Sequence, residues 1–177
     1  MSLYRLWFNT WSTDGKTIYF LAKMGKDKFT SLYQIAKDGG QAQKVITLKG
    51  TSISDYSLSG DNKKIALIAK PAKDKSEKKL KELGFKAEVY EEDLTNNKLF
   101  VVDLAASQEP ITPQAWDLAN YISDVHWSPT STSLLVKTQP TALIDDKYMK
   151  SQWHIVDAQS QKITTSFSTE GKLGAAE

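Results

Sequence analysis

Short apolar runs separated by polar turn residues recur along this chain. Three of the runs contain no charged side chain: Ile18–Ala22, Ile65–Ala69 and Leu134–Val136. An unbroken apolar run of this length, bounded by turn residues, predicts a strand that is buried on both faces. Asp14-Gly15 and Asp61-Asn62 stand before the first two runs, and these residue types favour tight turns. We therefore expect short antiparallel strands joined by hairpins.

The apolar runs belong to an internal repeat. Three segments align without gaps, and each contains a large apolar residue followed by serine: Leu6–Ile18, Ile53–Ile65 and Ile122–Leu134. Each is followed by a second apolar signature, at Leu32–Ile35, Leu99–Leu104 and Trp153–Asp157. Two signatures that recur in the same order indicate true repetition, which must be recognised before the fold is assigned.

The repeat predicts blades of a β-propeller. Each unit contains three clear strands and a weaker fourth, expected near Ala42–Leu48, Glu109–Thr112 and Gln161–Ser166. Four strands in a unit of about 47 residues are typical of such blades. The sequence therefore predicts an all-β fold, a β-propeller fragment of about three four-stranded antiparallel blades spanning residues 1–177. The blades are expected near residues 6–50, 51–115 and 120–168. A small β-sandwich, with two facing sheets, is the alternative.

The second unit contains an insertion over residues 71–93. Asp74 as the N-cap and Glu77 three residues later form a possible capping box, and Gly84 is a suitable residue for the helix end. The insertion therefore predicts a short helix that leaves the hairpin of the second blade.

Composition narrows the classes of function. The chain has 177 residues, 40% of them hydrophobic, and no cysteine, which allows a real core and excludes disulfides, cysteine catalysis and thiolate metal sites. Its 23 basic and 21 acidic residues are interleaved, as in residues 73–79, which is typical of a solvated surface. No apolar run approaches the roughly 18 residues of a membrane span. We expect a soluble protein, periplasmic or cytoplasmic, that binds neither nucleic acid nor membrane.

Particular segments resemble a known family. Trp11–Phe20 resembles the W-S-P-D-G-K-x-I-x-F signature of TolB-like propeller repeats. Residues 84–93 and 97–104 are similar to the amino-terminal propeller of prolyl oligopeptidase family serine peptidases, especially the acylaminoacyl-peptidase and dipeptidyl-peptidase branches. The resemblance extends from about Leu6 to Thr164. It implies a non-catalytic propeller that caps the active site and restricts substrates to short peptides.

The chain departs from this family in two ways. The third repeat has Ser-Pro-Thr-Ser at 128–131, and the second has Ser-Gly-Asp-Asn at 59–62, where the signature has S-P-D-G. The sequence also lacks the G-x-S-x-G motif of a nucleophile elbow. The chain is therefore predicted not to be an enzyme, while its parent would be a serine hydrolase. The implied partners are a catalytic α/β-hydrolase domain and a peptide substrate. A stand-alone TolB-like module for protein–protein binding is the alternative.

Three blades are too few for a closed ring, since propellers typically have four to eight. We therefore also expect self-association through the open blade edges as one way of covering them.

Few residues suggest chemistry. Glu91 and Glu92 are the candidate substrate-binding residues, because dipeptidyl-type relatives hold a substrate ammonium with a glutamate pair; a solvated acidic loop is the alternative. His126 and His154 are expected to be structural, and Asp145-Asp146 a solvated loop. No catalytic residue, metal site or cofactor is predicted.

The tryptophans are expected to serve the core. Trp7, Trp11, Trp127 and Trp153 occupy repeat positions and are predicted to pack between blades. Trp116 lies outside the strand signatures and is the candidate for exposure.

Overall fold

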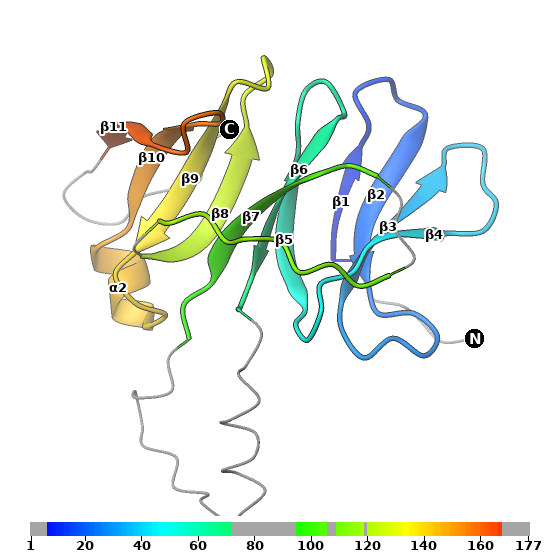
Figure 1. The fold of residues 1–177 in the computed structure, drawn as a ribbon, viewed down its shortest axis with the longest axis horizontal. Helices are drawn as coiled ribbons and strands as arrows, with labels where there is room; N and C mark the ends of the chain where they lie inside the picture. Colours follow the sequence, from blue (N-terminus) through cyan, green and yellow to red (C-terminus); the bar gives the residue numbers. More distant parts are fainter. Residues whose placement is uncertain (1–6, 72–94, 106–108, 119, 168–177) are drawn as a thin grey trace, which may run out of the picture.

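Three antiparallel β-sheets lie next to one another in chain order (Figure 1). The computed structural model describes residues 7–71, 95–105, 109–118 and 120–167. The first blade contains β1 (Trp7–Trp11), β2 (Thr17–Ala22), β3 (Ser31–Ala36) and β4 (Gln43–Ile46). The second contains β5 (Ile53–Leu58), β6 (Lys64–Ala69) and β7 (Lys98–Asp103). The third contains β8 (Tyr121–Trp127), β9 (Ser133–Gln139), β10 (Gln152–Asp157) and β11 (Ile163–Phe167).

Within each blade, each strand pairs with its neighbours in sequence, which is the meander expected of a propeller blade. The predicted all-β architecture of successive blades is therefore confirmed. The register shifts early in β1, β5 and β8, so the first strand of every blade carries an irregularity of the β-bulge type. The structure has three successive sheets and not the two facing sheets of the alternative, a small β-sandwich.

Most of the core lies in the two seams between neighbouring blades, and a smaller cluster on the first blade contains Phe20, Ala22 and Tyr33. Strand β6 contributes side chains to both seams, because its alternate side chains point to opposite faces of the sheet. Ile65 and Leu67 join the cluster shared with the first blade, and Ala66 and Ile68 join the cluster shared with the third. All four are at most 1% exposed. The prediction of a strand buried on both faces is confirmed for β6.

Strand β9 does not follow that prediction fully. Leu134 and Val136 are buried in the seam with the second blade, whereas Leu135 is only half-buried. The opposite face of β9 has no neighbouring sheet in the described part of the chain, and its burial therefore alternates.

Trp11, Leu58 and Trp127 occupy the same position of the repeat, but they are not buried to the same extent. Leu58 packs against the seam with the first blade, and Trp127 packs against the seam with the second. The equivalent residue of the first blade, Trp11, is 55% exposed, so its predicted packing between blades is wrong. The position faces the preceding blade, and no described residues form one before β1.

Two further tryptophans are buried, and one lies outside the description. Trp153 is buried, but it lies on the face of the third blade that points away from the second and packs in neither seam. Trp116, the candidate for exposure, is also buried, because it joins the second seam and its backbone N–H donates to the Leu99 carbonyl at 2.8 Å. The side chain of Trp7 lies outside the described residues.

The fourth strand is present in two of the three blades. Strands β4 and β11 confirm it in the first and third. In the second blade the prediction is wrong, because Ile111 forms a parallel bridge to Leu48 of the first blade. The Ile111 N–H donates to Thr47 O at 2.9 Å, and its carbonyl accepts from the Lys49 N–H at 2.8 Å. Prolines at 110 and 113 flank the bridge and lack the N–H groups that a longer ladder needs.

A short helix lies elsewhere than predicted. Helix α2 (Ile144–Met149) occupies the connection between β9 and β10, where a solvated loop was expected. Asp145 is exposed as predicted, but Asp146 is buried and accepts a hydrogen bond of 2.6 Å from Thr141 Oγ1. Asp146 also pairs with Lys150 at 2.8 Å, one helical turn further on. The helix predicted from Asp74 lies outside the described residues.

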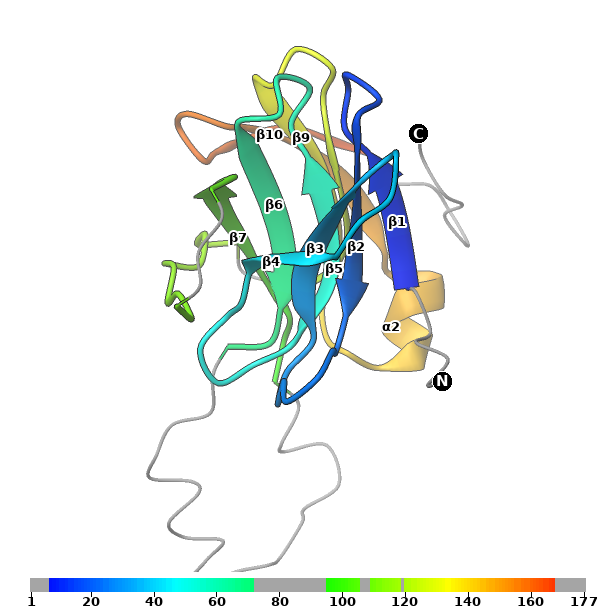
Figure 2. The same ribbon diagram turned by 90° about the vertical axis from the view of Figure 1, so that its right-hand side faces the viewer.

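The β1–β2, β5–β6 and β8–β9 turns gather at one end of the molecule, and α2 lies at the other (Figures 1 and 2). Polar groups of the three turns link the blades. The Thr13 N–H donates to Asn62 Oδ1 at 3.3 Å, and the Asp61 N–H donates to Ser131 Oγ at 3.0 Å. At Gly60 a Cβ atom would lie 2.1 Å from the Pro129 carbonyl oxygen. Only glycine allows this approach of two backbones.

We expect Gly60→Ala to destabilise the chain by about 1–3 kcal/mol, since overpacking against rigid backbone forces the seam apart. Urea denaturation followed by circular dichroism measures the change. Lys63→Ala, at an exposed position of the same turn, is the matched control. Equal stabilities of the two variants would contradict the role assigned to Gly60.

Candidate functional site

Polar side chains gather on the face of the third blade that points away from the second; we call it the outer face. Register places Asp124 opposite Lys137 and Tyr121 opposite Gln139 on β8 and β9. Trp153 lies opposite Lys137 on β10. These residues share one face because directly paired side chains project on the same side of a sheet.

The outer face differs chemically from the equivalent faces of the other blades. In the repeat alignment, Lys137 takes the place of Leu21 and Ile68. Those two residues are each 1% exposed and pack against the following blade. A lysine there would lose its hydration if another blade were packed in the same way, which is costly without a partner charge. The outer face is therefore better suited to polar contacts than to apolar packing.

Three charged or ionisable groups of this face lie close together. His126 Nε2 is 3.1 Å from Asp124 Oδ1, and the Lys137 ammonium lies 5.4 Å from the centre of the Trp153 ring. Burial alone would raise the pKa of Asp124, but hydrogen bonds and charge from His126, the Val125 N–H and Lys137 outweigh it and leave that pKa lowered. Asp124 is thus held as a carboxylate.

Asp55 of the second blade interacts electrostatically with Asp124 and His126. It lies opposite Ile68, on the side of the sheet that forms the seam with the third blade. Burial, supported by the negative charge of Asp124, raises the pKa of Asp55 to about 6, although the Tyr56 N–H and His126 act in the opposite direction. The two aspartates of the identical Ile-Ser-Asp triplets therefore have opposite shifts.

The two histidines have different surroundings. His154 is buried and hydrogen-bonded to Thr138 Oγ1 at 2.9 Å and Ser166 Oγ at 2.8 Å, and burial lowers its pKa. These features fit the predicted structural role. The side chain of His126 is 44% exposed, and it takes part in the charged group described above.

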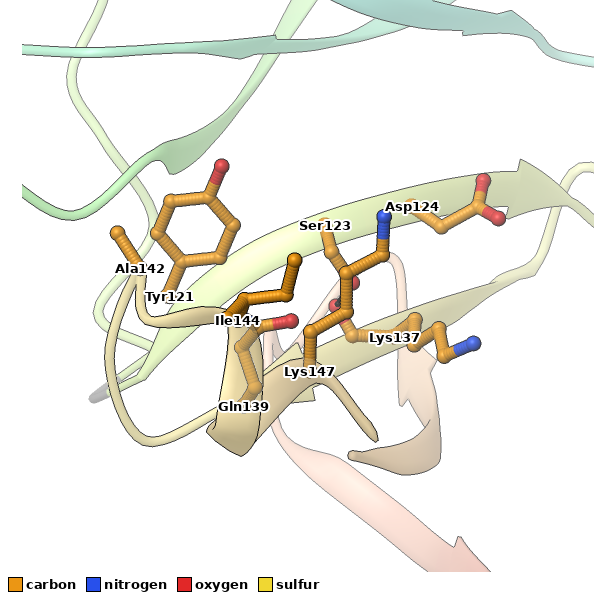
Figure 3. Close-up of a pocket in the computed structure, with 8 residues that line it drawn as sticks. All are labelled: Tyr121, Ser123, Asp124, Lys137, Gln139, Ala142, Ile144 and Lys147. Atoms are coloured by element: carbon orange, nitrogen blue, oxygen red, sulfur yellow. Dashed lines mark hydrogen bonds between the residues drawn. The ribbon is translucent and has the colours of Figure 1, made fainter. Parts of the chain in front are cut away.

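A pocket of about 410 Å³ opens between β8, β9 and α2 (Figure 3). We call it the β8–β9–α2 pocket. Its lining combines charged, polar and apolar side chains: Tyr121, Ser123, Asp124, Lys137, Gln139, Ala142, Ile144 and Lys147. The figure shows Lys147 extending from α2 toward β8.

Gln139 is the unusual member of this pocket. It is 2% exposed, and its Nε2 group donates to the carbonyls of Thr141 at 2.7 Å and Leu143 at 3.4 Å. Its Oε1 atom is buried and has no hydrogen-bond partner among the described residues. Buried acceptors are nearly always satisfied, so this atom requires an explanation.

A related pocket of about 570 Å³ lies where the second blade meets the third. Ser52 and Lys70 line it at the repeat positions of Tyr121 and Gln139, and Tyr121 of the next blade also contributes to its lining. Asn97 Nδ2 donates to the Tyr121 hydroxyl at 2.9 Å across that seam. The fold therefore generates a pocket at corresponding ends of two blades, with different lining residues in each.

The predicted site residues Glu91 and Glu92 lie outside the described residues. Within the described ranges, no group of three or more His, Asp or Glu side chains is arranged to hold a metal ion. Among the helices described, none is long and apolar enough to cross a membrane. Sequence reasoning missed Lys137, Gln139 and Lys147, although a lysine in an otherwise apolar repeat column was a usable signal for the first.

Comparison with known proteins shows a shared fold. No protein-family model matches the chain, and no curated protein matches it. A protein assigned as TolB from Agrobacterium tumefaciens is similar in structure, with a TM-score of 0.60 and 16% identity, over 95% of this chain and 51% of that one. The β-propeller domain of the Trilobed protease from Pyrococcus furiosus has a TM-score of 0.52 and 15% identity, over 94% and 43%.

An acylaminoacyl peptidase from Pyrococcus horikoshii is also similar, with a TM-score of 0.54 and 11% identity, over 96% of this chain and 25% of the peptidase. The chain thus spans about half or less of the length of each structure. At these identities the likeness establishes the propeller fold that TolB and peptidase domains share.

The raised pKa of Asp55 predicts a pH-dependent stability. Because its pKa of about 6 in the folded chain exceeds the ordinary value of 3.8, folding favours the protonated form. The contribution of this group to stability is complete below about pH 4 and is lost as the pH rises through about 6. Asp55→Asn keeps an acceptor for the Tyr56 N–H but cannot ionise. We expect it to gain about 1–2 kcal/mol relative to the wild type between pH 4 and pH 7.5.

Urea denaturation at a series of pH values measures this difference. The exposed Asp38→Asn is the control for a change of net charge. If the stability difference between Asp55→Asn and the wild type stayed constant over this range, burial of an ionisable Asp55 would be refuted.

Proposed function

We propose that this chain is the non-catalytic propeller portion of a serine oligopeptidase or exopeptidase. In this role it caps the active site of a hydrolase domain and restricts entry to short peptides. The observation that carries the proposal is the likeness to protease and peptidase structures over at least 94% of this chain. The repeat signatures and the family resemblance of the sequence support it independently.

The physical basis of the proposed role is the rigidity of the blades. Strands β2, β6 and β9 are each hydrogen-bonded on both edges, and the seams around β6 are filled with fully buried side chains. Such a wall yields little to a bulky substrate, because close-packed interiors resist deformation. Selection by size therefore requires no catalytic group in this chain.

The Ser166–His154 pair does not form a catalytic group. A serine nucleophile requires a histidine base that is itself oriented by a third group, usually a carboxylate. Here the other nitrogen of His154 contacts Thr138 Oγ1, which carries no charge. Ser166 lies within strand β11, rather than on a sharp strand-to-helix turn of the kind that exposes the nucleophile in α/β-hydrolases. Acyl transfer in the proposed peptidase therefore takes place in the hydrolase domain.

A second function has an observation in its favour. The TolB structure matches with a TM-score of 0.60, and this chain covers 51% of it. A stand-alone TolB-like module that binds a protein partner is the corresponding candidate. The two candidates differ in the parent gene: a following G-x-S-x-G motif with later Asp and His supports the peptidase, and a stop codon after further blades supports the module.

Assays of the chain and of its parent test the proposal. We expect no turnover of aminoacyl or dipeptidyl chromogenic substrates by the purified chain, because its described residues assemble no triad. The full-length parent should hydrolyse the same substrates and leave a long unfolded protein such as casein intact. A parent truncated to its hydrolase domain should lose this discrimination. Turnover by the chain alone, or a parent that cleaves short and long substrates equally well, contradicts the proposal.

A further inference from the structure

We infer that the β8–β9–α2 pocket binds the carboxyl end of a short peptide. Gln139 accepts the N–H of the terminal residue, and Lys147 pairs with its carboxylate. The inference deepens the proposed function and rests on it for the choice of a peptide as the ligand.

The unpartnered oxygen of Gln139 indicates a donor on the ligand. The Nε2 group is used to hold the loop before α2, so the amide cannot turn without losing both of its hydrogen bonds. This fixes Oε1 as the buried atom without a partner, and Figure 3 shows it on the side of Ile144 and Lys147. A backbone N–H satisfies such an acceptor, and every peptide bond not formed by proline offers one.

The lysines of the pocket indicate an anion on the ligand. Lys147 and Lys150 both lie near the end of α2, but Lys150 is held by the buried Asp146 at 2.8 Å. The ammonium of Lys137 lies over the Trp153 ring and beside Asp124. Lys147 therefore supplies the positive charge on the α2 side of the pocket, where a carboxylate would gain a charge-assisted hydrogen bond.

Other ligands fit the lining less well. An internal peptide segment carries no anion for Lys147. A phosphate group offers the Gln139 oxygen no N–H, and its double charge would be repelled by the Asp124 carboxylate. For the same reason an acidic terminal residue is disfavoured, whereas Ala142, Ile144 and the Tyr121 ring provide apolar surface for an aliphatic one. A volume of about 410 Å³ lies in the lower part of the range usual for small-ligand pockets.

Three related probes separate the contacts. N-acetyl-leucine carries both the N–H and the carboxylate, N-acetyl-leucinamide lacks the carboxylate, and N-acetyl-N-methyl-leucine lacks the N–H. Each is titrated into the ¹⁵N-labelled full chain and followed by amide NMR spectra, including the side-chain amide of Gln139. We expect saturable shifts at Tyr121, Gln139 and Lys147 with N-acetyl-leucine, and affinities lower by about tenfold or more for the other two probes.

Variants assign these losses to residues. Lys147→Gln should lower the affinity for N-acetyl-leucine by about tenfold and abolish its advantage over N-acetyl-leucinamide. The control is Lys63→Gln, at an exposed position in a distant turn, which should leave both affinities unchanged. Gln139→Met should abolish the effect of N-methylation. Because this variant also loses the two bonds to the loop, its amide spectrum must first show an intact fold; the N-methyl probe tests the same contact in the wild type.

Several outcomes would overturn the inference: equal affinities for the three probes, shifts that map outside the pocket, or no shift because water alone satisfies Gln139. These are separate from failure of the proposed function. A parent gene without a hydrolase domain refutes the peptidase but leaves carboxylate binding measurable in the chain, and an active peptidase with an inert pocket refutes only the inference.

Discussion

Burial of strand β6 on both faces is the constraint from which the arrangement of the blades follows. Ile65 and Leu67 on one face and Ala66 and Ile68 on the other are at most 1% exposed, so a sheet must cover each side. The first and third blades supply these covers, each through its own apolar strand. The stability of the three blades is therefore shared, since removing either outer blade would expose one face of β6 to water.

The same constraint leaves each terminal blade with one face that no described sheet covers, and the two faces differ. On the first blade this face includes Trp11, whose repeat equivalents Leu58 and Trp127 pack against a preceding blade. It therefore has the chemistry of a packing surface. On the third blade, Lys137 replaces the buried aliphatic residue, and the face carries a charged group and a pocket. The uncovered faces of the first and third blades are thus suited to different roles.

The repeat allowed the strands to be predicted, because apolar runs, turns and signatures are local properties of the sequence. The wrong predictions concern segments whose structure is determined by tertiary contacts. Residues 109–112 have the pattern of a fourth strand, yet Ile111 finds its hydrogen bonds on Leu48 and its neighbours in the adjacent blade. The pair Asp145-Asp146 looks solvated, but one carboxylate is buried by contacts with Thr141 and Lys150. Gln139 carries no signal at all in sequence, because an unpartnered oxygen is a property of its surroundings.

A repeated fold also explains how a binding site could arise without new architecture. Ser52 and Lys70 in the second blade correspond to Tyr121 and Gln139 in the third, and both pairs line a pocket at the same end of their blade. The backbone therefore supplies the cavity in each unit, and the side chains at a few repeat positions decide what it contains. In the seam, Tyr121 fills part of the space and accepts a hydrogen bond from Asn97. On the third blade, α2 forms the opposite wall instead, which brings Lys147 to the pocket and leaves the Gln139 oxygen without a protein donor among the described residues. Two differences distinguish the pocket of the third blade from the one at the seam: helix α2 in the β9–β10 connection, and Lys137 in an otherwise apolar repeat column.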